Sequence, residues 1–102
     1  NLTLPAEEER PIGVWGQRRL RYLKQYHKVI YYNLLTSGKL HSHLVDIDEE
    51  AQELFLRLEK EYAENENVTE QLKEEYPIEW IRRMNNIKMR VREMVNSEVI
   101  FG

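Results

Sequence analysis

The sequence predicts an all-α fold: a compact helical bundle of three main helices plus one or two short helices, with an extended N-terminal arm. Two observations predict it. Apolar residues recur at intervals of three and four along three separate stretches, which is the period of an amphipathic helix. Only four glycines and three prolines interrupt the 102 residues, and residues that favour helices are abundant. No cysteine is present, so packing without disulfides must stabilise the fold.

The first 13 residues, NLTLPAEEERPIG, contain two prolines and three consecutive glutamates and show no helical period. We therefore expect an extended arm over residues 1–13, followed by a single helical domain over residues 14–102. A G-x-x-G pair, Gly13 and Gly16, lies at this boundary. Such pairs clamp a nucleic-acid backbone in some RNA-binding domains, but the helix and strands that this requires are missing here. We expect the two glycines to let the chain turn into a helix and to let Trp15 pack down.

The first amphipathic stretch follows these glycines. Its stripe is Leu20, Leu23, His27, Ile30 and Leu34. The β-branched and aromatic run at 29–32 would suit a strand by propensity, but the longer helical period favours a helix. A break near His27 into two shorter helices stays open, and Gly38 is a natural residue to end this element in a left-handed conformation.

The second stretch is also helical in its period. Its stripe is Ile47, Ala51, Leu54, Phe55, Leu58 and Tyr62. Asp46 with Glu49 three residues later resembles a capping box. We therefore expect this helix to begin near Asp46, after a short connection with at most a helical turn at 40–44. Asn67 with Glu70 is expected to cap a further short helix that ends by Lys73, before the next proline.

The last stretch, Pro77 to Val99, is the one around which we expect the others to pack. Pro77 suits the first turn of a helix. The apolar stripe is Trp80, Ile81, Met84, Ile87, Val91, Met94 and Val95. A single helix cannot bury such a stripe by itself, so the rest of the chain must supply the opposite wall.

The net charge of −3 conceals a strong segregation of charge along the chain. Residues 10–45 contain seven lysines and arginines and no acid, and residues 46–79 contain thirteen acids and three bases. Residues 80–102 contain five bases and two acids. The positive and negative runs either pack against each other or face outward. We expect internal pairing, in which case added salt should weaken folding by screening the attraction.

The basic run mixes cations with tyrosines, as do surfaces that neutralise phosphates and stack bases. The tyrosine-rich helix around residues 18–32 is the centre of this hypothesis. The candidate nucleic-acid-binding residues are Arg18, Arg19, Arg21, Lys24, Lys28, Arg82 and Arg83. A competing hypothesis is that the acidic run engages a basic groove of a protein partner.

No catalytic or metal-binding pattern is indicated. His41 and His43 point in different directions on a helix, and His27 lies on an apolar stripe, so the three histidines do not form a ligand set. No serine or threonine has the context of an activated nucleophile, and the spacing of the acids singles out no acid–base pair. We therefore expect no enzyme activity, no cofactor and no bound metal.

Asn85 and Asn86 lie inside the predicted last helix, where each asparagine costs on the order of half a kcal/mol relative to alanine. One hypothesis is that they contact a ligand or a base edge. We favour a structural role, in which one of them bonds the backbone of the loop near 36–40 and fixes that loop against the helix.

Three segments together resemble a known family: RPIGVWGQRRLRYLK (10–24), NLLTSGKLHSHLVDIDEEA (33–51) and EWIRRMNNI (79–87). In this order they resemble the transposon-encoded protein TnpV family of Firmicutes mobile elements, over nearly the whole chain. The most specific parts are RRMNN (82–86) and LTSGKL (35–40). The resemblance implies a gene carried by conjugative or transposable elements, and it implies no defined reaction.

We therefore expect a non-enzymatic accessory or regulatory interaction protein of a mobile genetic element, which uses its acidic face to bind a nucleic-acid-handling protein. The alternative is direct DNA binding through the helix around residues 18–32. No apolar run approaches the roughly 18 residues that span a bilayer, so we expect a cytoplasmic protein without a membrane partner. The sequence does not indicate the identity of the protein partner or the oligomeric state.

Overall fold

The computed structural model describes residues 10–102, and within this range the protein is all-α, as the sequence predicts. The helices are α1 (Val14–Tyr26), α2 (Lys28–Thr36), α3 (Leu40–Asn65), α4 (Glu70–Glu75) and α5 (Pro77–Val95), and α5 continues into a π-helical turn, η2 (Asn96–Ile100). Most of the predicted arm, residues 1–9, lies outside the described residues. Residues 10–13 are not helical and lead directly into α1.

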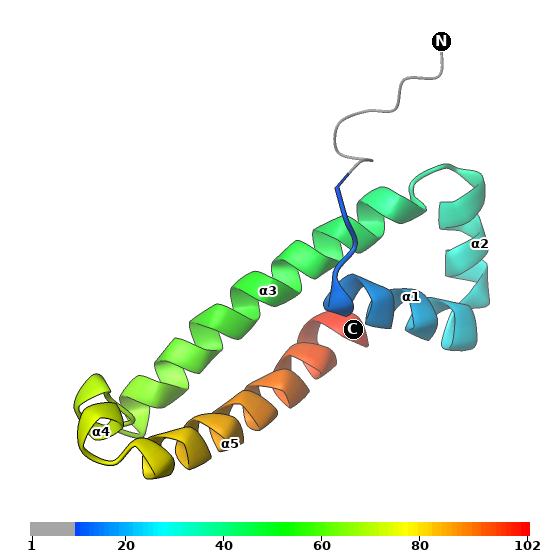
Figure 1. Cartoon of the computed structure of the whole chain (residues 1–102). Helices are drawn as coiled ribbons and strands as arrows, with labels where there is room; N and C mark the ends of the chain where they lie inside the picture. Colours follow the sequence, from blue (N-terminus) through cyan, green and yellow to red (C-terminus); the bar gives the residue numbers. More distant parts are fainter. Residues whose placement is uncertain (1–9) are drawn as a thin grey trace.

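Helices α3 and α5 form the long axis of the molecule. The 26 residues of α3 extend over about 39 Å at 1.5 Å per residue. Helix α5 runs back beside α3, and α4 lies at the turn between them (Figure 1). At the other end, α1 packs across α3 and against η2, and α2 connects α1 to the start of α3. The arrangement is elongated, with α1 and α4 at opposite ends.

The core lies between α3 and α5 and continues under α1. Its buried members come from α1, α3, α5, η2 and the connection before α4: Trp15, Ala51, Val68, Ile87, Val91, Val95, Val99 and Ile100. The ring of Trp15 lies against that of Phe55, with 5.9 Å between the centroids. The stripe predicted for the second stretch is confirmed, because all of its members are buried or half-buried along α3.

The stripe predicted for the last helix is confirmed only along its central line. The buried or half-buried members are Trp80, Met84, Ile87, Val91 and Val95. The predicted burial of Ile81 and Met94 is wrong, since 47% and 41% of these residues is exposed. The reason is that α5 is covered mainly by α3, with α4 and η2 at its two ends, so the buried stripe is narrower than the apolar stripe of the sequence.

The first amphipathic stretch forms two helices rather than one. The backbone leaves the helical conformation at His27, with φ −138° and ψ 60°, at the break that the sequence left open. Leu23 before the break is fully buried. Beyond it the predicted stripe is confirmed only at Leu34, which is half-buried. The predicted burial of His27 and Ile30 is wrong, because His27 is exposed and Ile30 is 44% exposed, and α2 has no fully buried residue. The apolar side chains that α2 leaves in solvent are Val29, Ile30, Tyr32 and Leu35.

Helix α3 begins at Leu40, not near Asp46, so the predicted capping box is wrong. Residues 40–46 contain no glycine or proline, and the helix therefore starts soon after Gly38, which makes the left-handed turn at φ 74°. Asp46 and Glu49 lie within the helix on its exposed side. Arg10 forms ion pairs there, at 3.6 Å to Asp46 and 3.1 Å to Glu49.

The cap predicted for α4 is also wrong. Thr69 is the N-cap, and its Oγ1 accepts a hydrogen bond from the amide of Leu72 at 3.1 Å. Asn67 instead adopts a left-handed conformation, φ 58°, which asparagine tolerates better than most residues, and it follows the end of α3. Pro77 begins α5, as predicted.

Gly13 and Gly16 let the first turn of α1 approach α3 closely, a role that was not predicted from the sequence. A Cβ atom at Gly13 would lie 2.8 Å from both carboxylate oxygens of Asp48, and one at Gly16 would lie 2.8 Å from the carbonyl oxygen of Leu44. Asp48 is only 4% exposed, and its Oδ1 accepts a hydrogen bond from the amide of Gly16 at 2.9 Å. Trp15, between the two glycines, is buried.

Candidate nucleic-acid interface

Helix α1 presents cations to solvent on the side that is not covered by α3. Arg21 and Lys24 are exposed, and so is Lys28, the first residue of α2. Arg18 is half-buried because its guanidinium stacks on Trp15, 4.9 Å from the ring centroid. Within residues 10–102 none of these four cations forms an ion pair with a carboxylate.

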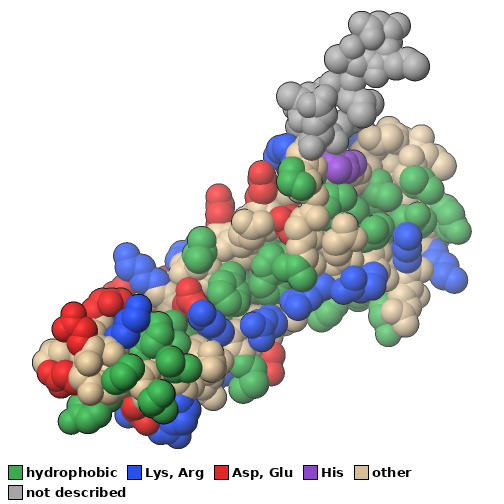
Figure 2. All heavy atoms as spheres, viewed as in Figure 1, with side chains coloured by type: hydrophobic (Ala, Val, Ile, Leu, Met, Phe, Trp, Pro, Cys, Tyr) green, Lys and Arg blue, Asp and Glu red, His purple; other side chains and the backbone are tan. Residues whose placement is uncertain are grey.

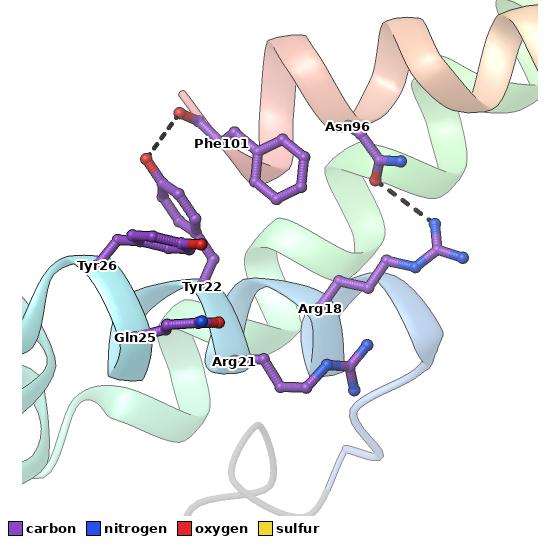
Figure 3. Close-up of a pocket in the computed structure, with 7 residues that line it drawn as sticks. All are labelled: Arg18, Arg21, Tyr22, Gln25, Tyr26, Asn96 and Phe101. Carbon is purple, nitrogen blue, oxygen red and sulfur yellow. Dashed lines mark hydrogen bonds between the residues drawn. The ribbon is translucent and has the colours of Figure 1, made fainter.

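A shallow hollow of about 350 Å³ lies where α1 meets η2 and the residue after it. The residues that line it are Arg18, Arg21, Tyr22, Gln25, Tyr26, Asn96 and Phe101 (Figure 3). Two hydrogen bonds join α1 to the C-terminal residues here. Arg18 Nη1 donates to Asn96 Oδ1 at 3.4 Å, and the Tyr22 hydroxyl donates to the carbonyl oxygen of Phe101 at 3.2 Å.

Three aromatic rings follow one another along one side of this hollow. The ring centroids of Tyr22 and Phe101 are 5.1 Å apart, and those of Tyr22 and Tyr26 are 5.7 Å apart. Tyr22 is held in place because its hydroxyl also lies 2.9 Å from His27 Nε2. The outer two rings are largely open to water, since 66% of Tyr26 and 51% of Phe101 is exposed.

Arg19, another predicted candidate, is used to hold the C-terminal residues. Its Nη1 donates to the main-chain oxygens of Ile100 at 2.8 Å and Gly102 at 3.1 Å, and its Nε donates to His43 Nε2 at 3.3 Å. Burial lowers the pKa of His43, and the nearby charge of Arg19 lowers it further, against an opposing effect of Asp46. A neutral imidazole can accept the hydrogen bond from Arg19. The Arg19 guanidinium therefore has a structural role, because all of these hydrogen bonds are within the protein.

Arg82 and Arg83 lie near the start of α5, at the end of the molecule opposite α1 (Figure 1). Both donate to Glu79: Arg82 Nη2 lies 2.7 Å from each carboxylate oxygen, and Arg83 Nε lies 2.7 Å from Oε2. The hydrogen bonds from Arg82 and then Arg83 lower the pKa of Glu79. The structure therefore does not bring these two arginines together with the candidates of α1.

Asn85 and Asn86 lie on the exposed surface of α5. Asn86 Oδ1 accepts a hydrogen bond from Arg90 Nε at 2.9 Å, and Arg90 pairs with Glu66, just past the end of α3, at 2.7 Å. The loop near 36–40 precedes the other end of α3. The expected bond between this loop and an asparagine of α5 is therefore absent from the described residues, because the whole length of α3 separates the two.

The expected internal pairing of the two charged runs is realised only at Arg10, within residues 10–102. In the same residues, the other ion pairs of the acids at 46–79 are all with cations of α5, as between Glu59 and Lys88 at 3.9 Å and between Glu66 and Arg90 at 2.7 Å. The basic side of α1 is left facing solvent. The prediction of internal neutralisation is therefore wrong for α1, because in the described part of the chain no cation of α1 forms an ion pair with a carboxylate of α3, although α1 packs on α3 beside Asp48.

The structure adds residues that the sequence did not single out. Arg92 is exposed and lies four residues before Asn96, hence one turn away on the same side of the helix. Asn96 in turn contacts Arg18, so Arg92 extends the cations of α1 onto α5. Figure 2 shows Lys and Arg side chains in a row along this edge. We call five residues the basic face: Arg18, Arg21, Lys24, Lys28 and Arg92.

The spacing of Arg92 and Asn96 could have been read from the sequence as one turn of a helix. The approach of Asn96 and Phe101 to α1 could not, because nearly the whole chain separates them from Arg18 and Tyr22. Asp48 did leave a signal, since it is a carboxylate that lies within an otherwise apolar helical stripe between Leu44 and Ala51.

Within residues 10–102 no three His, Cys, Asp or Glu side chains are grouped as metal ligands would be. His41 Nε2 lies 2.7 Å from the carbonyl oxygen of Arg10 and ties the entry of the chain to α3. None of the described helices is both long and apolar enough to cross a membrane.

The family model described as transposon-encoded protein TnpV matches residues 1–100 of the chain. No curated protein and no solved structure matches the chain. The family match spans all five helices, and it confirms the resemblance carried by the three sequence segments. The chain therefore belongs to the TnpV family of transposon-encoded proteins.

Proposed function

We propose that this protein is a non-enzymatic accessory protein of a transposon that binds nucleic acid through its basic face. The observation that supports this most strongly is the lack of carboxylate partners. In the part of the chain that the structure describes, none of the five cations of the basic face is neutralised by an ion pair. Surfaces that bind phosphates typically carry several cations close together that are not paired with carboxylates.

The negative net charge of the chain does not oppose this function, because many of the acids lie far from α1 or are already engaged beside it. The acids of α4 and the last three of α3 lie toward the end of the molecule opposite α1. In the half of α3 nearer α1, Asp46 and Glu49 pair with Arg10, and Asp48 accepts hydrogen bonds from Gly16 and Gln52. Charges more than about 10 Å apart are largely screened from each other at 0.1 M ionic strength. The acids at the far end of the molecule would therefore have little effect on a phosphate backbone at the basic face.

The proposal is tested by fluorescence anisotropy with a labelled oligonucleotide at about 50 mM salt. The test variant is Arg18→Gln with Arg21→Gln, and the matched control is Arg82→Gln with Arg83→Gln, which removes the same charge at the other end. We expect the parent and the control to bind with similar affinity and the test variant to bind at least about tenfold more weakly, since each lost phosphate contact reduces counterion release. Equal weakening by both variants would mean that only overall charge matters.

A second candidate function is the binding of a basic protein, such as one that handles nucleic acid, by the acidic end. It is supported by α4, where Glu70, Glu74 and Glu75 are exposed and form no ion pair within residues 10–102. Its test is a pull-down from the host after nuclease treatment. A partner that is retained by the parent but lost on Glu74→Lys with Glu75→Lys would support this function, and a partner that is unaffected by the charge reversal would contradict it.

A further inference from the structure

The hollow beside α1 combines features that the neutralisation of phosphates does not require. Cations on an exposed helix suffice to follow a backbone, but this hollow is also lined by aromatic rings and by the side-chain amides of Gln25 and Asn96. Its volume of about 350 Å³ lies at the lower end of the range for small-ligand sites, about 300 to 1,000 Å³. The space is therefore large enough to admit one group of the size of a base.

The two sides of the hollow differ in chemistry. The aromatic rings lie toward one side, and the guanidinium groups of Arg18 and Arg21 lie toward the other (Figure 3). The exposed rings of Tyr26 and Phe101 offer faces on which a base can stack, and the arginines can contact the phosphates next to that base. Stacking of a base on an aromatic side chain contributes about 1–3 kcal/mol and does not depend strongly on sequence.

The aromatic side is fixed before any ligand arrives. Tyr22 donates to the carbonyl oxygen of Phe101, and Arg19 donates to that of Ile100 at 2.8 Å, so the C-terminal residues are tied to α1 from two directions. A site that is already ordered loses less conformational entropy on binding. This arrangement favours a specific contact over an incidental one.

Bases in a duplex are stacked on each other and cannot enter such a hollow without leaving the helix, which costs a few kcal/mol. Bases of a single strand are already accessible. We propose that the hollow accepts one unstacked base of a single-stranded nucleic acid, with Arg18 and Arg21 on the adjoining phosphates. This inference rests on the proposed function and narrows its ligand to the single-stranded form.

The test compares three labelled probes of equal length: a single-stranded oligothymidine, a duplex, and a single strand in which the bases are replaced by abasic sites. The test variant is Tyr26→Leu with Phe101→Leu, which keeps apolar bulk but removes the rings. The matched control is Tyr32→Leu, which removes a ring that is 57% exposed on α2, outside the hollow. Thermal melts establish that all variants are folded.

We expect the parent to bind the oligothymidine at least about tenfold more tightly than the other two probes. The test variant should lose about 5- to 150-fold in affinity for the oligothymidine, as for one stacked base, and should change less than about twofold for the duplex. Tyr32→Leu should change none of the three. As an independent measurement, ultraviolet cross-linking of a bromodeoxyuridine single strand to the parent should label peptides that contain Tyr26 or Phe101.

The inference is overturned if the parent binds all three probes equally, if the test variant weakens all three equally, or if the cross-links fall outside the hollow. If the parent bound all three probes equally but still required Arg18 and Arg21, the proposed function would be supported and only the single-strand inference would be wrong. An absence of binding to any probe at low salt would overturn both. The two failures are therefore distinguishable.

Discussion

Asp48 is the residue that most directly joins the entry of the chain to its core. Its carboxylate is buried, and it accepts hydrogen bonds from the amide of Gly16 at 2.9 Å and from the side chain of Gln52 at 2.7 Å. Gly16 lies in the first turn of α1, where unsatisfied amides and the positive end of the helix dipole favour an anion. A side chain of α3 thus caps α1, which fixes the orientation of the helix that bears most of the basic face.

We therefore predict that Asp48→Ala lowers the free energy of unfolding by about 1.5–3 kcal/mol, the range for hydrogen bonds to a charged group. Asp48→Asn should lose less, because an amide oxygen can still accept from Gly16. Urea denaturation measures the effect, with Asp46→Asn as the control on the exposed side of the same helix. If the Ala variant were as stable as that control, Asp48 would not be the anchor of α1.

His43 makes stability depend on pH. In the folded protein, burial and the positive charge of Arg19 lower its pKa below the ordinary value of 6.5. The negative charge of Asp46 opposes this effect without cancelling it. The unfolded chain then binds a proton more readily than the folded one, so stability falls as the pH decreases from about 6.5 toward the folded pKa. We predict that this slope is present in urea titrations of the parent and is reduced in His43→Gln, which keeps an acceptor for Arg19.

The control for this prediction is His27→Gln, since His27 is exposed between α1 and α2. That variant should keep the slope of the parent. Persistence of the full slope in His43→Gln would assign the pH dependence to another group. Below about pH 4.5 a separate loss is expected, because hydrogen bonds from arginine lower the pKa of Glu66 and Glu79, and protonation of these acids then opposes folding.

At the scale of elements, α1 and α2 differ in how they are held. Leu23 of α1 is fully buried, whereas Ile30 of α2 is 44% exposed although both belong to one helical stripe in the sequence. We predict that Leu23→Ala costs about 2–5 kcal/mol of unfolding free energy and that Ile30→Ala costs less than about 1 kcal/mol. Equal losses would show that α2 is packed more tightly than its exposed side chains indicate.

The same comparison explains how much of the fold the sequence could predict. Helical periods identified the amphipathic stretches correctly, because a stripe at intervals of three and four records which residues face a neighbour. The helical periods did not reveal which other helix covers each stripe, or how much of the stripe it covers. Ile81 and Met94 lie on the stripe but outside the width that α3 covers, and α2 continues the stripe of α1 after the chain has turned away at His27.

Local end signals were less reliable than periods. The Asp46–Glu49 pattern is a genuine capping motif in form, but nothing before it interrupts the helix, and so α3 starts at Leu40. For the candidate site, the sequence supplied the cations and tyrosines of α1. It could not supply Asn96 and Phe101, because their contact with α1 depends on α5 returning along α3. Nor could the sequence show that Arg19 forms hydrogen bonds with the main-chain oxygens of Ile100 and Gly102.

Across the whole molecule, those acids of α3 and the turn after it that form ion pairs do so with cations of α5 and with Arg10, and within residues 10–102 the acids do not neutralise the cations of α1. The ion pairs that link elements lie at the surface, each with at least one exposed partner, and surface pairs contribute about 0–1 kcal/mol each. We predict that the unfolding free energy in urea changes by less than about 1 kcal/mol when sodium chloride is raised from about 50 to 500 mM. A steady loss of several kcal/mol would indicate that the two charged runs neutralise each other within the fold.

If cations of α1 and α5 form one surface for phosphates, as we propose, the salt dependence of binding measures it most directly. For a single strand, log K falls with log salt by about 0.7 per phosphate contacted. Five cations of the basic face therefore predict a slope near −3.5 for the parent.

The decisive variant is Arg18→Gln, Arg21→Gln and Arg92→Gln together, with Arg82→Gln and Arg83→Gln as the control at the other end. The measurement is the slope of log K against log salt for a labelled oligothymidine. We predict that the triple variant reduces the magnitude of the slope by about 2 and that the control leaves it unchanged. A parent slope near zero, or a triple variant with the slope of the parent, would contradict the account.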